Sequence, residues 1–430
     1  MGWRGVLEGF YGQPFAEGDR LELVAWCGRR GIRDYVYSPK GDPLLRDSWR
    51  EPIPAGTHLV RLVDACREAG VRLSVCVSPG LDWQGEPDHG ALTVKLQALL
   101  DLGVHQVGVA WDDVPRGGAE LGASHAAGVS AAVLALPPGS LRATCPTDYS
   151  ASTATAYLRA FCDALAPGVE VFWTGPAIVS PRIPVDEVRA LTAELGRTLV
   201  LADNFPVNDG PMSGVLHLGP PPPRDPELPS VVGGLLLNLM ELPLASRIGV
   251  DAYLRWWDTP TTDPEHCWQA ALVDVPGIEP LARAACSWLT SPGPDPELLA
   301  WAEAALSSGD RSLEQWLARG CREGLAASWQ SELEPWLVAW EWQAFVINAA
   351  LESRRAPAAK RVQAAFLVGE AWRRAQSMPQ QLFGTRFALY PVTAQQGDEV
   401  VPRREGLVRG ETLLDLVCRR VLAELLEGTS

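Results

Sequence analysis

Hydrophobic and polar residues alternate with two different periodicities along the first part of the chain. Short runs rich in Val, Leu and aromatic residues predict strands, and longer runs with apolar residues three and four positions apart predict helices between most of them. One helical run places Leu21, Val24 and Ala25 on a single face, and Gly31 follows as a helix stop. The predicted strands are Gly5–Glu8, Asp34–Tyr37, Leu73–Val77, Gln106–Trp111, Leu141–Cys145, Val169–Trp173, Leu199–Ala202 and Gly233–Leu237.

Eight strands that alternate with helices predict parallel pairing through right-handed crossovers. A length of roughly 250 residues is usual for an eight-fold barrel of this kind. A doubly wound open sheet is the competing topology, but no glycine-rich dinucleotide fingerprint follows the first strand. We therefore predict an α/β fold, a (β/α)8 TIM barrel over residues 1–260. Residues 219–226 (GPPPPRDP) interrupt the last repeats as a stiff, polyproline-like spacer.

The hydrophobic pattern changes after Trp257. A turn-like segment follows, and then a Trp-rich region in which the apolar residues recur almost throughout with the period of a helix. One stripe follows i, i+3, i+4 spacing over several turns, which is typical of a buried helix in a bundle. The alternative is that this stripe forms an exposed face that stacks on sugars or mediates dimerisation. The stripe consists of Leu333, Trp336, Leu337, Trp340, Ala344, Ile347 and Leu351. With a last helix near Leu413–Leu426, residues 261–430 are predicted to form a C-terminal all-helical domain.

Composition and charge narrow the class of partner. The chain of 430 residues has a net charge of −15, so duplex nucleic acid and anionic membranes are poor partners. Its nine Cys are scattered without a CxxC pair, which indicates neither a disulfide framework nor a zinc site. The N-terminus does not resemble a signal peptide, and no uncharged stretch of about 18 apolar residues is present. We predict a cytoplasmic protein with reduced thiols.

Two adjacent carboxylates after the fourth predicted strand are the clearest candidates for chemistry. The sequence VGVAWDDV at residues 107–114 places Asp112 and Asp113 side by side at the strand's end, where parallel barrels carry their active sites. Neighbours on a strand point to opposite faces, so both can serve one site only where the chain leaves the sheet. Two carboxylates near a sugar can divide the work, one ionised and the other with a raised pKa. A helix N-cap or a metal pair is the alternative interpretation.

The other strand ends carry groups suited to a neutral polyhydroxylated ligand. Glycines and aromatic rings follow the first strand, and Lys40, one of only three lysines, follows the second. Amides and carboxylates that bind hydroxyl groups, together with aromatic platforms, occur after the later strands. The Arg-rich, Gly-rich nest that a phosphate needs is not prominent, and His is scarce, so neither a metal nor a His-centred triad is predicted.

Seven motifs occur in a fixed order over most of residues 1–258. They are GVLEGFYG at 5–12, YSPK at 37–40 with WRE at 49–51, WDD at 111–113, CPTDY at 145–149, WTGP at 173–176, DN at 203–204 with ND at 208–209, and Asn238. Together they resemble glycoside hydrolase family 84, the β-N-acetylglucosaminidases that include protein O-GlcNAcases and bacterial enzymes called hyaluronidases. The resemblance continues weakly at residues 334–337.

The resemblance implies retaining, substrate-assisted hydrolysis of a terminal β-linked GlcNAc, on a GlcNAc glycoside or glycoprotein. In this mechanism the substrate's own 2-acetamido oxygen attacks the anomeric carbon and gives an oxazoline-type intermediate, an intramolecular step. Asp112 matches the residue that orients and polarises the acetamido N–H. Asp113 matches the general acid that protonates the leaving oxygen and then activates water. No metal and no organic cofactor is implied.

The matches also imply a set of substrate-binding residues. The sugar hydroxyl groups would bind to the Gly9 backbone, Lys40, Asp209 and Asn238. Tyr149 and Asn204 would contact the acetamido oxygen or the intermediate. Cys145 lines the pocket for the acetamido methyl group, and the aromatic rings of Phe10 and Tyr11 complete the set.

Two positions depart from the family pattern and keep alternatives open. Ala202 stands where many members carry Trp, and Gly210 stands where many carry Tyr. They leave open the alternative that the protein is a β-N-acetylhexosaminidase of different specificity, for GalNAc or a modified aminosugar. A non-catalytic glycan-binding or scaffold protein on a degenerate barrel is a further alternative, as is a Schiff-base aldolase that uses Lys40. The helical region is expected to buttress the barrel and to form a homodimer.

Overall fold

A closed barrel of eight parallel strands forms the N-terminal part of the computed structural model, which describes residues 2–288, 291–390, 393–396, 399–402 and 406–427. The strands pair in sequence order, and the last pairs with the first. They are β1 (Trp3–Glu8), β2 (Asp34–Tyr37), β3 (Arg72–Val77), β4 (Gln106–Ala110), β5 (Leu141–Cys145), β6 (Glu170–Trp173), β7 (Leu199–Asp203) and β8 (Gly234–Asn238). The predicted (β/α)8 barrel is confirmed, and each strand lies close to its predicted residues.

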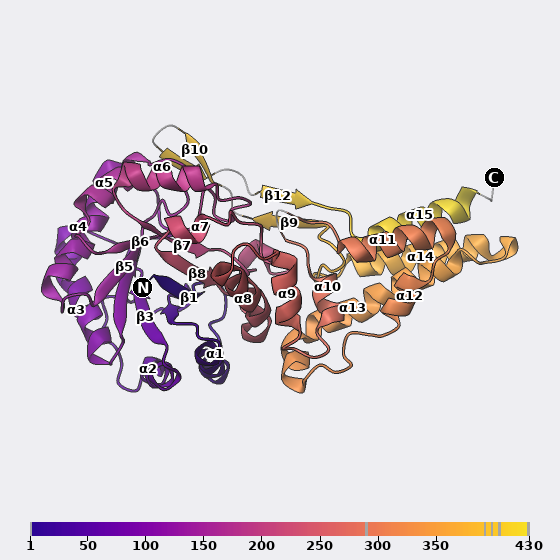
Figure 1. The fold of residues 1–430 in the computed structure, drawn as a ribbon, viewed down its shortest axis with the longest axis horizontal. Helices are drawn as coiled ribbons and strands as arrows, with labels where there is room; N and C mark the ends of the chain where they lie inside the picture. Colours follow the sequence, from indigo (N-terminus) through magenta and orange to yellow (C-terminus); the bar gives the residue numbers. More distant parts are fainter. Residues whose placement is uncertain (1, 289–290, 391–392, 397–398, 403–405, 428–430) are drawn as a thin grey trace.

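Helices surround the barrel as an outer layer (Figure 1). They are α1 (Glu17–Arg29), α2 (His58–Ala69), α3 (His89–Asp101), α4 (Ala119–Ala135), α5 (Ala156–Ala164), α6 (Val185–Leu195), α7 (Leu228–Val231) and α8 (Pro243–Asp258), with the 3-10 turns η1 (Glu86–Asp88) and η2 (Gly210–Met212) in the loops. In α2 the apolar face of Leu59, Leu62 and Cys66 is buried. Gly70 ends this helix at a φ of 68°, a left-handed conformation that glycine adopts without steric cost.

Strand residues alternate between the barrel interior and the helical layer. Inward-facing side chains form a small apolar cluster that includes Val36, Ala110, Phe172, Ala202 and Leu236. The alternate positions join a much larger cluster between the strands and the helices. The interior is therefore packed with side chains, and barrels of this kind carry their sites at the carboxyl ends of the strands.

The rest of the chain is mainly helical and extends to one side of the barrel (Figure 1). It contains α9 (Pro264–Leu272), α10 (Glu279–Ala284), α11 (Pro296–Ser308), α12 (Ser312–Leu317), α13 (Ala327–Ser353), η3 (Ala358–Lys360), α14 (Arg361–Gln376) and α15 (Leu413–Glu427). The predicted Trp-rich stripe lies on α13, and all of its residues are buried, as a bundle core requires. The helical region is confirmed, and the exact boundary at residue 260 stays a prediction.

Four short strands lie within this region, so it is mainly helical rather than the all-helical domain that the sequence predicted. They form two antiparallel pairs and are β9 (Phe387–Tyr390), β10 (Thr393–Gln396), β11 (Glu399–Pro402) and β12 (Gly406–Arg409). Strand β9 lies against η2 in the loop after β7. Beside it, the Gln381 backbone N–H donates to the Gly214 carbonyl at 2.9 Å. The C-terminal region therefore contacts the rim of the barrel.

Helix α8 joins the two parts. Its Tyr253 and Trp256 belong to the core of the barrel, whereas Ile248 belongs to a second cluster that continues through the helical region. The carboxylate of Glu332 on α13 accepts hydrogen bonds from the backbone N–H groups of Leu244 and Ala245, which are otherwise unpaired at the first turn of α8. Over the described residues, no helix combines the length and the apolar character that crossing a bilayer would take.

Candidate active site

A cavity of about 490 Å³ opens at the carboxyl ends of the strands, and every strand of the barrel or the loop after it contributes to its lining. It brings together the catalytic and substrate-binding residues that the sequence predicted, with one exception. Those that line it are Gly9, Tyr11, Lys40, Asp112, Asp113, Cys145, Tyr149, Asn204, Asp209 and Asn238. The exception is Phe10, which is buried and packs against Phe15 with ring centroids 4.9 Å apart.

Asp112 and Asp113 both face this cavity because the chain turns sharply after β4. Trp111 still follows the sheet, since its backbone N–H donates to the Cys145 carbonyl at 2.8 Å. Asp113 then adopts a left-handed conformation with a φ of 57°. Aspartate tolerates this region better than most residues. The turn overrides the alternation of the strand, and two neighbouring carboxylates reach the same site.

Asp112 is paired with Lys40 on one side and open on the other. The Lys40 ammonium donates to Oδ2 of Asp112 at 2.5 Å. Oδ1 of Asp112 is buried and has no partner among the described residues. Burial disfavours the charge of Lys40, but the carboxylates of Asp112 and Asp113 outweigh this effect and raise the pKa of Lys40. A lysine held in its ammonium form is a poor Schiff-base nucleophile, which argues against an aldolase.

Asp113 has different partners. The hydroxyl groups of Tyr11 and Tyr149 each donate to one of its carboxylate oxygens at 2.9 Å. Burial, reinforced by the charge of Asp113, raises the pKa of both tyrosines above the usual value. Both phenols therefore keep their protons and remain donors. The two phenols fix the carboxylate at the cavity wall, and no cationic side chain of the described residues forms an ion pair with it.

Amide and carboxylate groups cover the side of the cavity formed by β7, β8 and β1. Asn238 donates through Nδ2 to Oδ1 of Asn204 at 2.9 Å, and Asn204 donates to the Ile178 carbonyl at 2.8 Å. The second polar atom of Asn238, Oδ1, is buried and has no partner among the described residues. Asp209 accepts from the Tyr11 backbone N–H at 2.6 Å. Burial raises the pKa of Asp209.

The lining is divided into a polar part and an apolar part. In the polar part, Lys40 follows β2, Asp209 lies in the loop after β7 and Asn238 ends β8. The apolar part comes from β5 to β7 and their loops, and consists of Cys145, Phe172, Ile178, Val179, Ala202 and Val207. A ligand with hydroxyl groups on one side and a small apolar substituent on the other would match this division.

Several of the apolar lining residues were missed at the level of sequence. Phe172 follows the inward alternation of β6, so its place could have been derived from the strand pattern. Ile178, Val179 and Met212 lie in loops, where no periodicity indicates which way a side chain points. Both positions that depart from the family pattern, Ala202 and Gly210, also border the cavity.

Comparisons with known proteins find a family model and similar proteins that match the chain. A family model described as beta-N-acetylglucosaminidase matches residues 4–290. The protein O-GlcNAcases of Rattus norvegicus and Mus musculus are each 32% identical to the chain over 254 residues, which cover 54% of this chain and 27% of each relative. The chain thus matches about a quarter of the length of these relatives.

A solved structure of an O-GlcNAc hydrolase mutant from Thermobaculum terrenum is similar over almost the whole chain. The TM-score is 0.81 at 24% sequence identity, and the match covers 99% of this chain and 95% of the other. At this level of identity the likeness shows a shared fold, which includes the helical region as well as the barrel.

Proposed function

The chain belongs to the β-N-acetylglucosaminidase family, the glycoside hydrolases of family 84 that its motifs resemble, and from this premise we propose that it hydrolyses terminal β-linked GlcNAc by substrate-assisted catalysis. One observation carries the proposal. Asp112 and Asp113 face a single cavity but have different partners, a lysine for the first and two tyrosines for the second. Their environments suit them to two separate tasks.

Asp112 orients the nucleophile. Its buried Oδ1 needs a donor, because an unpaired buried acceptor costs free energy, and the N–H of a 2-acetamido group would supply one. The amide oxygen then forms a bond to the anomeric carbon while the bond from that carbon to the aglycone oxygen breaks. Positive charge develops on the amide nitrogen and is stabilised by the carboxylate. The attack is intramolecular, so no side chain has to act as the nucleophile.

Asp113 moves the proton. As an acid it gives its proton to the leaving oxygen when the glycosidic bond breaks. The carboxylate that results accepts the hydroxyl donors of Tyr11 and Tyr149. In the second step this carboxylate takes a proton from water as the water attacks the anomeric carbon and reopens the oxazoline. Two inversions give net retention, and the acetamido group is restored.

The remaining lining residues hold the sugar. Lys40, Asp209 and Asn238 are suited to the hydroxyl groups, together with the backbone of Gly9. Tyr149 and Asn204 border the place of the acetamido oxygen, and Cys145 lies in the apolar part that would take the methyl group. Tyr11 is 43% exposed and its hydroxyl contacts Asp113, so we place the leaving aglycone beside it. Phe10 lies behind this loop and supports it.

We expect the protein to hydrolyse an aryl β-GlcNAc and to release the β-anomer first, which NMR of the early product detects. An aryl β-GalNAc, an aryl α-GlcNAc and an aryl β-glucoside serve as matched controls. The β-glucoside lacks the amide nucleophile and should not turn over. A higher kcat/KM for the GalNAc substrate would favour the different specificity that Ala202 and Gly210 suggested. Binding of GlcNAc in calorimetry without any turnover would favour the non-catalytic alternative.

We also propose that the helical region forms a homodimer. Large apolar side chains are exposed along α13 and α14, and exposed patches of this kind commonly mark interfaces. They are Val338, Phe345, Val362, Phe366 and Leu367. A cytoplasmic location is proposed as well, because all nine cysteines are unpaired thiols.

Light scattering should give the mass of a dimer, and replacing Phe345 and Phe366 with Glu should give a monomer. Val94 on α3 is the control, because it is 70% exposed, as Phe366 is, but lies on the barrel. The variant Val94→Glu should remain a dimer. A monomeric wild-type protein, or dissociation by both changes alike, would contradict the proposed interface.

A further inference from the structure

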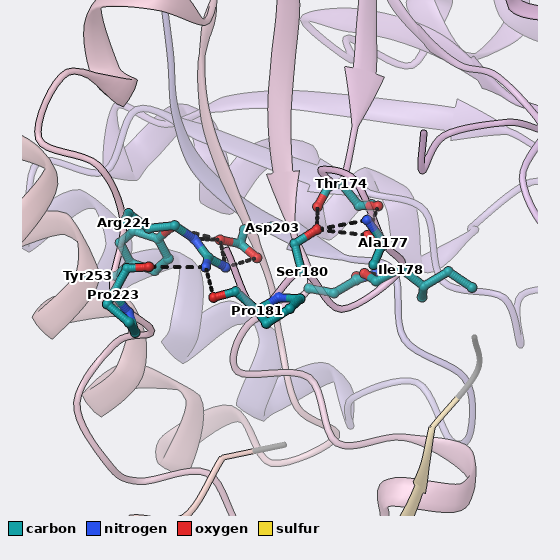
Figure 2. A network of polar contacts seen from close by, with 10 residues as sticks. Thr174, Ala177, Ile178, Ser180, Pro181, Asp203, Pro223, Arg224 and Tyr253 are labelled. Carbon is teal, nitrogen blue, oxygen red and sulfur yellow. Dashed lines mark hydrogen bonds and ion pairs between the residues drawn. The ribbon is translucent and has the colours of Figure 1, made fainter. Parts of the chain in front are cut away.

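The end of β7 sends neighbouring side chains to opposite sides of the barrel wall. Ala202 and Asn204 line the cavity, whereas Asp203 between them is only 1% exposed and points away from it. Figure 2 shows what Asp203 meets there: Arg224 from the proline-rich segment and Tyr253 from α8. The reaction proposed above uses none of these three side chains.

The contacts among them are close and fully buried. Arg224 donates through Nη2 and Nε to the carboxylate of Asp203 at 2.9 and 3.1 Å, and the Tyr253 hydroxyl donates to the same carboxylate at 2.7 Å. Burial disfavours the charge of Arg224, but Asp203 outweighs this effect and raises the pKa of the guanidinium group. A buried pair of this kind adds little stability relative to apolar side chains of the same volume, so we look for its value in the geometry that it fixes.

Arg224 also reaches the loop after β6. Its Nη1 donates to the Pro181 carbonyl at 3.3 Å (Figure 2). On the cavity side, Asn204 holds the same loop by donating to the Ile178 carbonyl at 2.8 Å. Within the loop, Ser180 donates to the Thr174 carbonyl at 3.0 Å. The loop is therefore held from both sides of the barrel wall, by Asn204 in front and by Arg224 behind.

This loop supplies much of the apolar part of the cavity through Ile178 and Val179, which line it together with Phe172 and Ala202. If the proposed function holds, the acyl substituent of the aminosugar occupies this apolar part, because Asp112 takes its N–H and the hydroxyl groups face the other way. A rigid apolar wall discriminates between acyl chains by their length.

We propose that Arg224 is a positioning residue that sets the acyl-chain selectivity of the cavity, by holding Asp203, and with it Asn204, and the loop of Ile178 and Val179 in fixed positions. This inference rests on the proposed function. The proline-rich segment is then more than a spacer, since its stiff backbone holds Arg224 on the side of the barrel wall away from the cavity.

The test compares kcat/KM for aryl β-glucosaminides that carry either an N-acetyl or an N-butanoyl group. For Arg224→Gln we expect the ratio of N-acetyl to N-butanoyl activity to fall by about fivefold or more, because fitting a methylene group against a fixed wall is worth roughly tenfold or more. Glu227→Gln is the matched control. It breaks an exposed ion pair with Arg189 beside the same segment and should leave the ratio unchanged.

A second variant covers the case in which Arg224→Gln fails to fold. Ser180→Ala removes the hydrogen bond that closes the loop, leaves no buried charge unpaired, and should shift the ratio in the same direction by a smaller factor. An unchanged ratio in an active, folded variant would overturn the inference and leave the proposed function intact. A wild-type protein that hydrolyses none of these substrates would overturn both.

Discussion

Replacing Asp113 with Asn should lower kcat/KM for GlcNAc linked to an alkyl or sugar alcohol by about 10³-fold, within the range that general acid catalysis contributes. An amide cannot deliver a proton to the leaving oxygen, and such alcohols leave poorly without one. An aryl substrate with an acidic phenol needs little protonation, so its first step should be affected much less. Initial rates over a series of leaving groups, plotted against the pKa of the alcohol or phenol, measure the difference.

The fold should survive this change, because an Asn side chain can still accept from one tyrosine and donate to the other. Azide supplies a control within the same variant. It attacks the intermediate without a general base, so it should accelerate turnover of the activated aryl substrate and give a β-glycosyl azide. An equal loss on all leaving groups, with no azide effect, would count against the assignment of Asp113.

The barrel and its cavity followed from the sequence because both obey simple periodicities. Alternation along the strands fixed which residues face inward, and the rule that parallel strands carry chemistry at their carboxyl ends brought Lys40, Asp112 and Asn238 to one place. Phe10 shows the limit of this reasoning. It precedes Tyr11 in a loop where alternation no longer applies, and only the packing against Phe15 decides that one ring is buried while the next reaches the cavity.

Long-range contacts account for what the sequence left out. Asp203 and Arg224 are separated by the whole loop after β7, and nothing in the proline-rich segment indicates which carboxylate its arginine meets. The strands β9 to β12 have only four residues each, which is too short for a clear period, and β9 pairs with β12 across the segment that contains β10 and β11. The turn at Asp113 is different, because the sequence predicted that both carboxylates serve one site at the end of the strand, and the structure adds the left-handed φ of 57° by which the chain turns there.

Replacing Asp112 with Asn should reduce kcat/KM by about 10²- to 10³-fold for every substrate, whatever its leaving group, as expected when a single electrostatic contact to a transition state is lost. Asp112 acts on the acetamido nitrogen, so its loss weakens the nucleophile rather than the departure of the aglycone. Lys40 would also lose the carboxylate that it contacts at 2.5 Å. The same leaving-group series therefore separates the two aspartates: a nearly constant loss for Asp112→Asn, and a graded loss for Asp113→Asn.

A thiazoline analogue of the oxazoline intermediate tests the same role of Asp112 without any turnover. Its ring nitrogen takes up a proton and then presents a charged N–H to the carboxylate, an interaction worth more than a neutral hydrogen bond. We expect competitive inhibition of the wild-type protein and a clear loss of affinity for Asp112→Asn, whereas Asp113→Asn should retain most of it. Equal affinity of all three proteins for the thiazoline would mean that Asp112 does not bind the nitrogen. If the thiazoline does not inhibit the wild-type protein, that result would contradict substrate assistance itself.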